Sequence, residues 1–468
     1  MNARIVAVGA AAPMLRLTAA DVAEAWGRGG GRGQSALCAP DEDTLTLAWE
    51  AGSRALEAAG LDAAVVDGLW WGTTRPPFAE GPSHSFLASA LGLAAESGGA
   101  LLSGSTHSGI DALAAAADAI VAGSARIALV IASDALRPGP GTGAESRCGA
   151  GAAAIVLSAE GGAGSIGARI TRHHPVVDRY RGDADTETRD LYDGRLFREE
   201  IFLPIATAVI EPLAALEPRA WSLPDPDGRL GATLAKRAGT STPPSASVYA
   251  ELGDTGAAAA LLGAIGSLDA AGTIGIVAYG GGRATGVAVH ADRPVPGATS
   301  VARVLSEGRE ITYTAALRAR GQLVAAGETI PMGVPPESAM FVRGAEEMLG
   351  LLGGRCVDCG TISTPPSIHP HCVACGGPKL EPVSLARHGT VHTYVVNYTM
   401  PAPFVAPLPI AVLDLDDGAR LMLQVVGDGE ELAIGRAVRL VLRRYSYERG
   451  VPVYGFKAKS IAMEEGSL

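Results

Sequence analysis

The sequence has few aromatic residues, no long apolar run and little positive charge. Phe, Tyr and Trp make up 5% of 468 residues, so small aliphatic side chains must fill the interior. No stretch reaches the roughly 18 apolar residues that a membrane span requires. The apolar residues 5–15 (IVAVGAAAPML) are typical of a strand and a turn, not of a signal peptide. We therefore expect a cytoplasmic chain without a membrane partner.

Positive charge is outweighed by 49 acidic against 38 basic side chains, a net charge of −11. Such a balance argues against nucleic acid or an anionic membrane surface as the main partner, while local basic patches remain able to hold a phosphorylated ligand. The length predicts two or three domains, and the 47% hydrophobic content predicts a large soluble interior.

Cysteine is scarce as well, and four of the six cysteines stand together. They follow the pattern C-x2-C-x12-C-x2-C and are Cys356, Cys359, Cys372 and Cys375. Each C-x2-C pair directs two sulfurs to one point, and two pairs complete a tetrahedral zinc site. Four thiolates leave no open position, so the zinc is expected to be structural. A disulfide interpretation is weak in a reducing compartment.

The first 292 residues contain a repeat. Residues 108–133 align without a gap on residues 255–280, and Gly109 meets Gly256. Both copies read as a small-residue helix, a turn and a continuous apolar strand, as in a sheet covered on both faces. In this alignment His107 stands at the position of Asp254. Both residues would then begin central helices, where free backbone N–H groups and partial positive charge collect.

Several segments resemble the thiolase superfamily, with hydroxymethylglutaryl-CoA synthase and β-ketoacyl-carrier-protein synthase III as the nearest members. The resemblance rests on residues 41–62 for an outer helix, 106–113 for the nucleophile turn, 149–157 for a hairpin and 251–262 for a second catalytic turn. Residues 280–289 resemble the closing turn and strand. The implied fold class is α/β, a duplicated five-layered thiolase-like fold with halves at 1–160 and 161–292.

The C-terminal part resembles an acyl-CoA-associated family in which a rubredoxin-like zinc ribbon leads into an OB-fold. Five plausible barrel strands follow the cysteines, at 388–398, 409–415, 419–426, 437–445 and 454–461. The predicted organisation is a linker rich in Pro and Gly at 293–340, a ribbon at 341–380 and a small β-barrel at 381–468.

The catalytic positions depart from this family's pattern. His107 stands where the relatives carry a nucleophilic cysteine, and Asp254 where synthases carry an asparagine. Pro224 or Asp225 stands where a histidine is expected. The acyl-enzyme route of the relatives therefore cannot be transferred to this chain. An imidazole tuned between helix N-termini and Asp254 could act as a base or as a hydrogen-bond donor to a thioester oxygen.

The resemblance also implies an oxyanion site at the glycine turn Gly280, Gly281 and Gly282. Ser103, Ser105 or Ser108 could pair with His107 as a nucleophile, although serine at a helix start is usually a cap. Cys148 precedes an apolar strand and is more simply a buried thiol than a reactive one.

These features predict an enzyme that transfers an acyl group, or makes or breaks a C–C bond, beside a CoA or carrier-protein thioester. An aldol-type lyase and a non-catalytic acyl-CoA-binding scaffold remain alternatives. CoA phosphates need cations, and the clearest cluster is Arg443, Arg444 and Arg449 around two tyrosines. A solvated basic barrel face explains that cluster equally well. Relatives are homodimers, and we expect the strand near residues 101–105 to meet its twofold mate.

Overall fold

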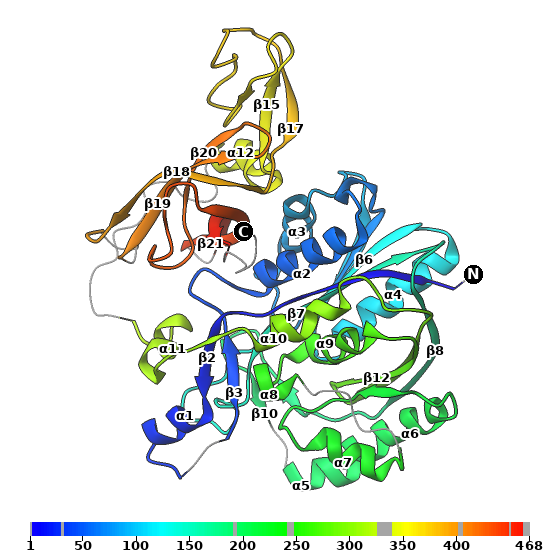
Figure 1. The fold of residues 1–468 in the computed structure, drawn as a ribbon. Helices are drawn as coiled ribbons and strands as arrows, with labels where there is room; N and C mark the ends of the chain where they lie inside the picture. Colours follow the sequence, from blue (N-terminus) through cyan, green and yellow to red (C-terminus); the bar gives the residue numbers. More distant parts are fainter. Residues whose placement is uncertain are drawn as a thin grey trace, which may run out of the picture. The chain divides into compact units, whose positions relative to one another are not determined.

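The computed structural model describes residues 2–29, 32–190, 194–240, 248–324, 339–400, 406–448 and 451–461. The chain divides into two compact units, Met1–Val324 and Ala325–Leu468. Within the described residues, no helix is both long and apolar enough to cross a membrane. Figure 1 gives the order of the elements along the chain.

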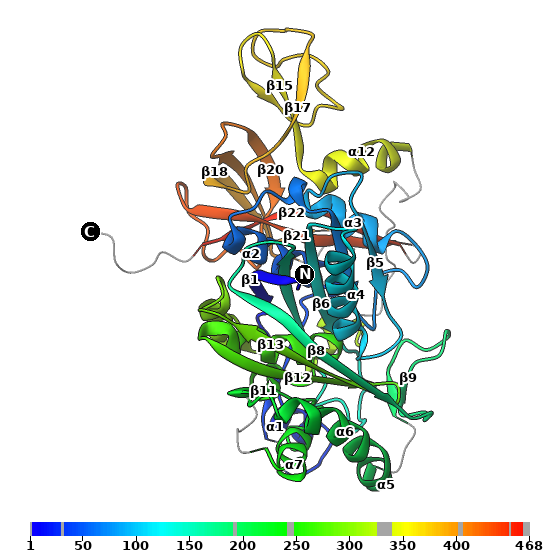
Figure 2. The ribbon, with the colours of Figure 1, turned by 90° about the vertical axis from the view of Figure 1, so that its right-hand side faces the viewer.

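One large mixed sheet forms the frame of the first unit. Its strand order is β11-β12-β13-β8-β1-β7-β6-β4-β5. The first half contributes β1 (Arg4–Ala11), β4 (Gly68–Gly72), β5 (Gly98–Leu102), β6 (Ile127–Ala135) and β7 (Ala150–Ser158). The second half contributes β8 (Gly164–His173), β11 (Ala220–Ser222), β12 (Gly272–Gly280) and β13 (Arg283–Ala291). Figure 2 shows β8 beside β13, with which it pairs antiparallel.

The two halves repeat the same order of elements, as the internal alignment predicts. In each half an antiparallel hairpin, β6–β7 or β12–β13, pairs through its first strand with a parallel neighbour, β4 or β11. The halves join where β1 meets β8, with Arg4 opposite Ser165. The duplicated α/β fold class is thereby confirmed.

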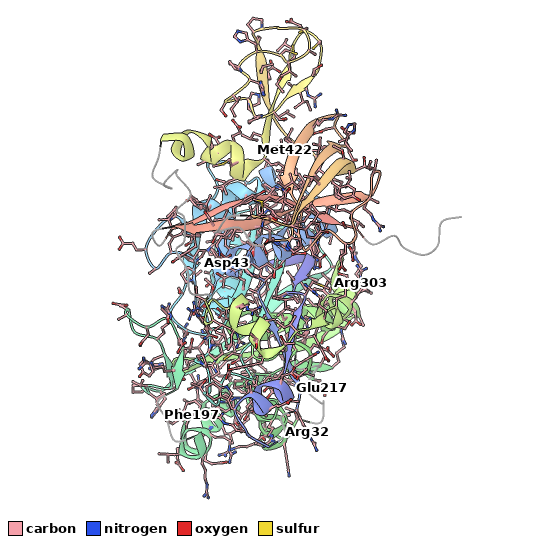
Figure 3. The ribbon with its side chains drawn as sticks, turned by 90° about the vertical axis from the view of Figure 1, so that its left-hand side faces the viewer. Arg32, Asp43, Phe197, Glu217, Arg303 and Met422 are labelled. Carbon is pink, nitrogen blue, oxygen red and sulfur yellow. The ribbon has the colours of Figure 1, made fainter. Side chains whose placement is uncertain are left out.

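The outer helix α2 (Thr44–Ala59) begins and ends where its sequence dictates. The Asp43 carboxylate accepts the N–H groups of Leu45 and Thr46, and the Thr46 hydroxyl accepts the N–H of Asp43, which completes a capping box. Gly60 ends the helix in the left-handed conformation. Figure 3 labels Asp43 at this helix start. The buried face of α2 packs on β1, β6 and β7.

Helices form three layers around the sheet of the first unit. Helix α2 packs with α3 (Ser83–Leu91) against the first half, and α6 (Leu203–Ala214) packs with α7 (Leu230–Arg237) against the second. Between them lie the central helices α4 (Ser108–Ala122) and α9 (Ala259–Gly266), which contact each other. Figure 1 shows α4 and α9 in the middle of this unit, between α2 and α6.

Small residues allow the central helices to approach closely. A Cβ added to Gly109 would lie 2.1 Å from the Ala257 carbonyl oxygen, and one on Gly256 would lie 2.3 Å from Oδ2 of Asp134. Gly256 also has φ +56°, which disfavours any other residue. The aligned glycines of the repeat are therefore the contact points of the two halves.

Residues 293–324 of the predicted linker at 293–340 belong to the first unit. Residues 298–319 form η5 (Ala298–Ser300), α10 (Val301–Ser306), β14 (Arg309–Glu310) and α11 (Tyr313–Ala319), and Val295, Val301 and Ala316 are buried. The proline and glycine signals were turns between packed elements, so 293–324 is not a linker. Residues 325–338 lie outside the described residues.

The remaining elements of the first unit are short. They are β2 (Leu15–Thr18), α1 (Ala19–Ala25), β3 (Gln34–Leu37), η1 (Ala63–Val65), β9 (Arg179–Tyr180), β10 (Arg189–Asp190), α5 (Gly194–Phe197), η2 (Arg198–Phe202), α8 (Tyr249–Leu252), η3 (Gly256–Ala258) and η4 (Ser267–Asp269). Strands β14, β2 and β3 form a separate three-stranded sheet.

The second unit contains a helix, a ribbon and a barrel. Helix α12 (Ala339–Gly350) precedes the ribbon strands β15 (Leu352–Cys356), β16 (Ile362–Ser363) and β17 (Leu380–Ser384). The barrel strands are β18 (His388–Asn397), β19 (Leu408–Leu415), β20 (Arg420–Gln424), β21 (Ala437–Glu448) and β22 (Val451–Ser460). Their order is β20-β19-β18-β21-β22, and Val425 pairs with Ala458 to bring the two edges together. The five predicted strands are confirmed.

Candidate active site and four-cysteine cluster

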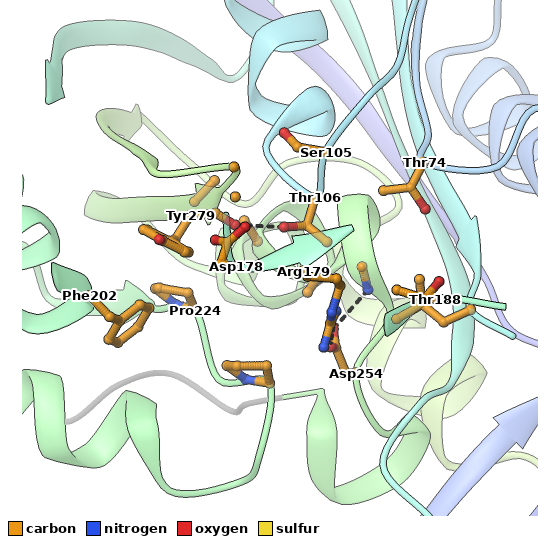
Figure 4. Close-up of a pocket in the computed structure, with 18 of the residues that line it drawn as sticks. Thr74, Ser105, Thr106, Asp178, Arg179, Thr188, Phe202, Pro224, Asp254 and Tyr279 are labelled. Atoms are coloured by element: carbon orange, nitrogen blue, oxygen red, sulfur yellow. Dashed lines mark hydrogen bonds and ion pairs between the residues drawn. The ribbon is translucent and has the colours of Figure 1, made fainter. Parts of the chain in front are cut away.

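A cavity of about 500 Å³ lies in the first unit where the start of α4 meets the second half. Its lining includes the turn Ser103–Thr106, the glycines Gly280 and Gly281, and Asp254. Figure 4 places Phe202, Pro224 and Tyr279 toward one end and Thr74 and Thr188 toward the other. The cavity therefore has an aromatic end and a polar end.

The two turns that flank the cavity touch each other. The Thr106 hydroxyl donates to the Tyr279 carbonyl oxygen at 2.8 Å, a contact drawn in Figure 4. A Cβ on Gly280 would lie 2.4 Å from Oγ1 of Thr106 and 2.6 Å from the His107 nitrogen. Only glycine permits this approach at position 280, which brings together two turns that both line the cavity.

The ring of His107 is not among the groups that line the cavity. It is 1% exposed, and its Nε2 lies 2.9 Å from Oγ1 of Thr285. Its Nδ1 lies 2.8 Å from Nη2 of Arg283 and 3.0 Å from Oδ2 of Asp111. The expected pairing of His107 with Asp254 does not occur. The carboxylate beside the His107 ring is that of Asp111, one turn further along α4.

The neighbours His107 and Arg283 change the pKa of Asp111. Burial by itself would raise the pKa of Asp111, but hydrogen bonds and attraction from His107 and Arg283 outweigh burial and lower it. Arg283 also pairs directly with Asp111. The buried His107 and Thr285 and the partly exposed Asp111 and Arg283 therefore form a polar cluster that joins α4 to β13.

Asp254 and Asp225 both line the cavity, as does Pro224. Asp254 is 6% exposed, its Oδ2 lies 2.7 Å from Nη1 of Arg179, and its Oδ1 accepts the Gly256 N–H at 2.9 Å. The Oδ1 of Asp225 accepts the Gly231 N–H at 3.2 Å. Both carboxylates therefore have partners within the protein. Figure 4 shows the Arg179–Asp254 pair.

The predicted oxyanion glycines divide between two positions. Gly280 and Gly281 line the cavity, whereas Gly282 does not; its carbonyl accepts the His174 N–H at 2.7 Å. Of the alternative nucleophiles, Ser103 and Ser105 line the cavity and Ser108 does not. Cys148 is buried outside the lining.

Burial raises the pKa of the Cys148 thiol to about 11. A thiol with so high a pKa is protonated at neutral pH and is a poor nucleophile. No cysteine or histidine occurs among the described residues that line the cavity.

Sequence reasoning missed Asp178. This carboxylate lines the cavity and is 4% exposed. Among the described residues it forms no hydrogen bond or ion pair. It immediately precedes β9, whose Arg179 is anchored by Asp254. The three charged residues among positions 178–181 were the available signal, but a short polar segment of this kind is usually read as a solvated loop.

The four cysteines of the ribbon converge as their spacing predicts. Their sulfurs all lie within 4.8 Å of one another, with Cys356 and Cys375 at 3.6 Å and Cys359 and Cys372 at 3.5 Å. Tetrahedral thiolates around zinc at 2.3 Å stand about 3.8 Å apart. The donor set and its spacing therefore fit a metal ion, while His369 and His371 are not part of the cluster.

The predicted phosphate-binding arginines of the barrel do not form a surface pair. Arg443 is 1% exposed and its Nη1 donates to the Leu442 carbonyl at 2.9 Å. Arg444 lies 5.8 Å from the ring centroid of Tyr447, and Arg449 is outside the described residues. Arg443 is therefore buried in the barrel, like the residues that directly precede it on β21, and does not form a surface pair with Arg444.

Comparisons with known proteins agree with this architecture. Residues 382–443 match the family described as ChsH2, C-terminal OB-fold domain. A DUF35 domain-containing scaffold protein of Methanothermobacter thermautotrophicus is 36% identical over 129 residues, which are 26% of this chain and 96% of that protein.

The hydroxymethylglutaryl-CoA synthase of Pyrococcus horikoshii is 31% identical over 154 residues, 33% of this chain. The chain spans only 44% of that relative's length. The structure of MvaS in complex with 3-hydroxy-3-methylglutaryl coenzyme A superposes with a TM-score of 0.57 at 21% identity, covering 71% of this chain and 95% of MvaS. The chain thus belongs to the DUF35 domain-containing family, and its first unit shares the thiolase-like fold of the MvaS structure.

Proposed function

We propose that the first unit is an enzyme that makes or breaks a C–C bond beside an acyl thioester and uses Asp178 as its general base. The observation that carries this proposal is a buried carboxylate that faces the cavity with no partner among the described residues. Burying such a group costs free energy unless a ligand compensates, and catalytic groups are where such costs are commonly retained.

The cavity suits carbanion chemistry better than covalent acyl transfer. No cysteine is among the described residues that line the cavity, so no thiol there can form a covalent acyl-enzyme. Asp178 would remove a proton from the carbon next to the thioester carbonyl, and the negative charge would move to the carbonyl oxygen. Backbone N–H groups of the Thr106 and Gly280 turns would stabilise that oxygen. The resulting enolate can add to a second carbonyl, and the reverse sequence is an aldol-type cleavage.

Asp254 has a positioning role in this proposal. Its ion pair with Arg179 holds the segment that carries Asp178, and its bond to the Gly256 N–H ties that segment to the start of the second central helix. His107 would act in the same indirect way, by fixing the turn whose main chain faces the cavity.

The substrate of this proposal is a thioester of CoA or of a carrier protein. Support comes from the fold shared with MvaS, whose structure contains 3-hydroxy-3-methylglutaryl coenzyme A. In the second unit, Cys356, Cys359, Cys372 and Cys375 would hold zinc, which would stabilise the ribbon without entering the reaction.

Deuterium exchange tests the base directly and needs no second substrate. Acetyl-CoA and succinyl-CoA are incubated with the full chain in D₂O, and the α-deuterium above that of a protein-free control is measured by mass spectrometry. We expect Asp178→Asn to slow exchange by about 10²–10⁴-fold. The control Asp183→Asn changes an exposed carboxylate of the same segment and should exchange normally. Undiminished exchange in Asp178→Asn would remove Asp178 from the mechanism.

A non-catalytic thioester-binding scaffold is the second candidate. The match to a scaffold protein over 96% of its length favours it, as does the departure from the family's catalytic residues. Under this alternative the parent protein binds the thioesters but catalyses no exchange with any of them.

A further inference from the structure

Arginines from three separate segments line the cavity without a carboxylate partner. They are Arg75 after β4, Arg147 before β7 and Arg181 after β9. Among the described residues, their hydrogen bonds go to main-chain carbonyl oxygens, at 2.7, 2.9 and 3.5 Å respectively. None of the three forms an ion pair with another described residue. Their positive charge is therefore not neutralised by a salt bridge.

Arg75 is the most constrained of the three. Its Nη1 is buried and has no hydrogen-bond partner among the described residues. Burial and then the nearby cations Arg181 and Arg137 lower its pKa to about 10, against the attraction of Asp134. The Asp134 carboxylate is itself occupied by a threonine hydroxyl at 2.8 Å and a main-chain N–H at 3.0 Å. Arg75, which lines the cavity, thus keeps one buried guanidinium nitrogen without a partner in the described part of the chain.

The carboxylates of the cavity do not balance these cations. Asp254 pairs with Arg179, and Asp225 and Asp227 accept main-chain N–H groups. The fourth carboxylate, Asp178, is the proposed base. Three arginines from distant positions 75, 147 and 181 therefore converge on a cavity whose aspartates are engaged elsewhere.

We propose that Arg75, Arg147 and Arg181 form an anion subsite that binds a carboxylate on the acyl chain of the substrate. This inference rests on the proposed function and narrows its substrate class to thioesters of dicarboxylic acids. The subsite shares one cavity of about 500 Å³ with the Thr106 and Gly280 turns, so the anion it holds must lie within a short acyl chain of the thioester. The phosphates of CoA are a whole pantetheine arm away from the sulfur.

Acyl-CoA ligands of matched chain length show how much the acyl carboxylate contributes to the binding affinity. Binding to the full chain is measured by calorimetry with malonyl-CoA and succinyl-CoA, with the uncharged propionyl-CoA and butyryl-CoA, and with free CoA. A bidentate guanidinium–carboxylate contact predicts that the parent prefers the charged acyl groups by about tenfold to a hundredfold. Arg75→Gln/Arg181→Gln should abolish that preference and leave the affinities for butyryl-CoA and free CoA unchanged.

Two further variants make the result independent of folding defects. Arg181→Gln alters an exposed residue and should reduce the preference by itself. Arg198→Gln removes a cavity-lining cation that already pairs with Glu199 at 2.9 Å, and it should leave the preference intact. Equal binding of charged and uncharged acyl groups by the parent would overturn the subsite alone. If the double variant bound every ligand more weakly by the same factor, free CoA included, the arginines would bind the CoA phosphates, and the proposed subsite would be overturned as well. Failure of all thioesters to bind would reject the proposed function as well.

Discussion

Replacement of His107 by alanine distinguishes a structural histidine from a catalytic one. The ring is 1% exposed and has polar partners on both nitrogens, Thr285 on one side and Arg283 with Asp111 on the other. Two lost hydrogen bonds, one of them to a charged group, cost about 2–4 kcal/mol together. The cavity left by a buried ring adds about 1–2 kcal/mol. We expect His107→Ala to destabilise the first unit by about 3–6 kcal/mol.

Chemical denaturation of the full chain, followed by tryptophan fluorescence, measures this loss. Five tryptophans are present, and the buried Trp71 and Trp221 report on the first unit. His107→Gln is the matched variant, because its amide can keep a bond to Thr285, and it should lose less stability than alanine. An unchanged denaturation midpoint for His107→Ala, combined with a hundredfold loss of exchange activity, would show that the ring works in the cavity and that its buried contacts are unimportant.

Metal analysis should return about one zinc per chain. Cys356→Ser should lower the solubility of the second unit, while α-deuterium exchange by the first unit persists. The pKa of Asp111 is lowered on folding, so its stabilising charge is present above its unfolded pKa of about 3.9 and is lost as pH falls through the folded value. Asp111→Asn should therefore reduce stability by about 1 kcal/mol at pH 7, and the difference from the parent should begin to shrink below about pH 4 and vanish below the folded pKa. Strand β5 is the last strand of the sheet and its residues Gly98, Gly99 and Ala100 are exposed, so we expect a homodimer through β5; light scattering at micromolar concentration should give twice the chain mass, and Ala100→Lys should give monomers.

Local signals in the sequence were sufficient for most of the fold. The cysteine spacing alone predicted four converging sulfurs, because each C-x2-C turn directs both side chains inward. The family resemblance and local strand signals predicted the five barrel strands, and the sequence around Asp43 supplies the capping box that begins α2. The repeat predicted the duplicated halves, since Gly109 and Gly256 occupy equivalent helix starts in both. In each case the determining contacts lie within a few residues or within one repeated unit.

Side-chain direction at the site was decided by tertiary structure. The sequence placed His107 at a helix start, but Thr285 and Arg283, more than 170 residues away, drew its ring away from the cavity. The same is true of the residues that sequence reasoning missed. Asp178 and the arginines at 75, 147 and 181 stand in unremarkable polar segments, and only the packing of the two halves brings them to one cavity. Composition and spacing specify which elements form, whereas the groups that face a ligand depend on partners contributed by distant segments.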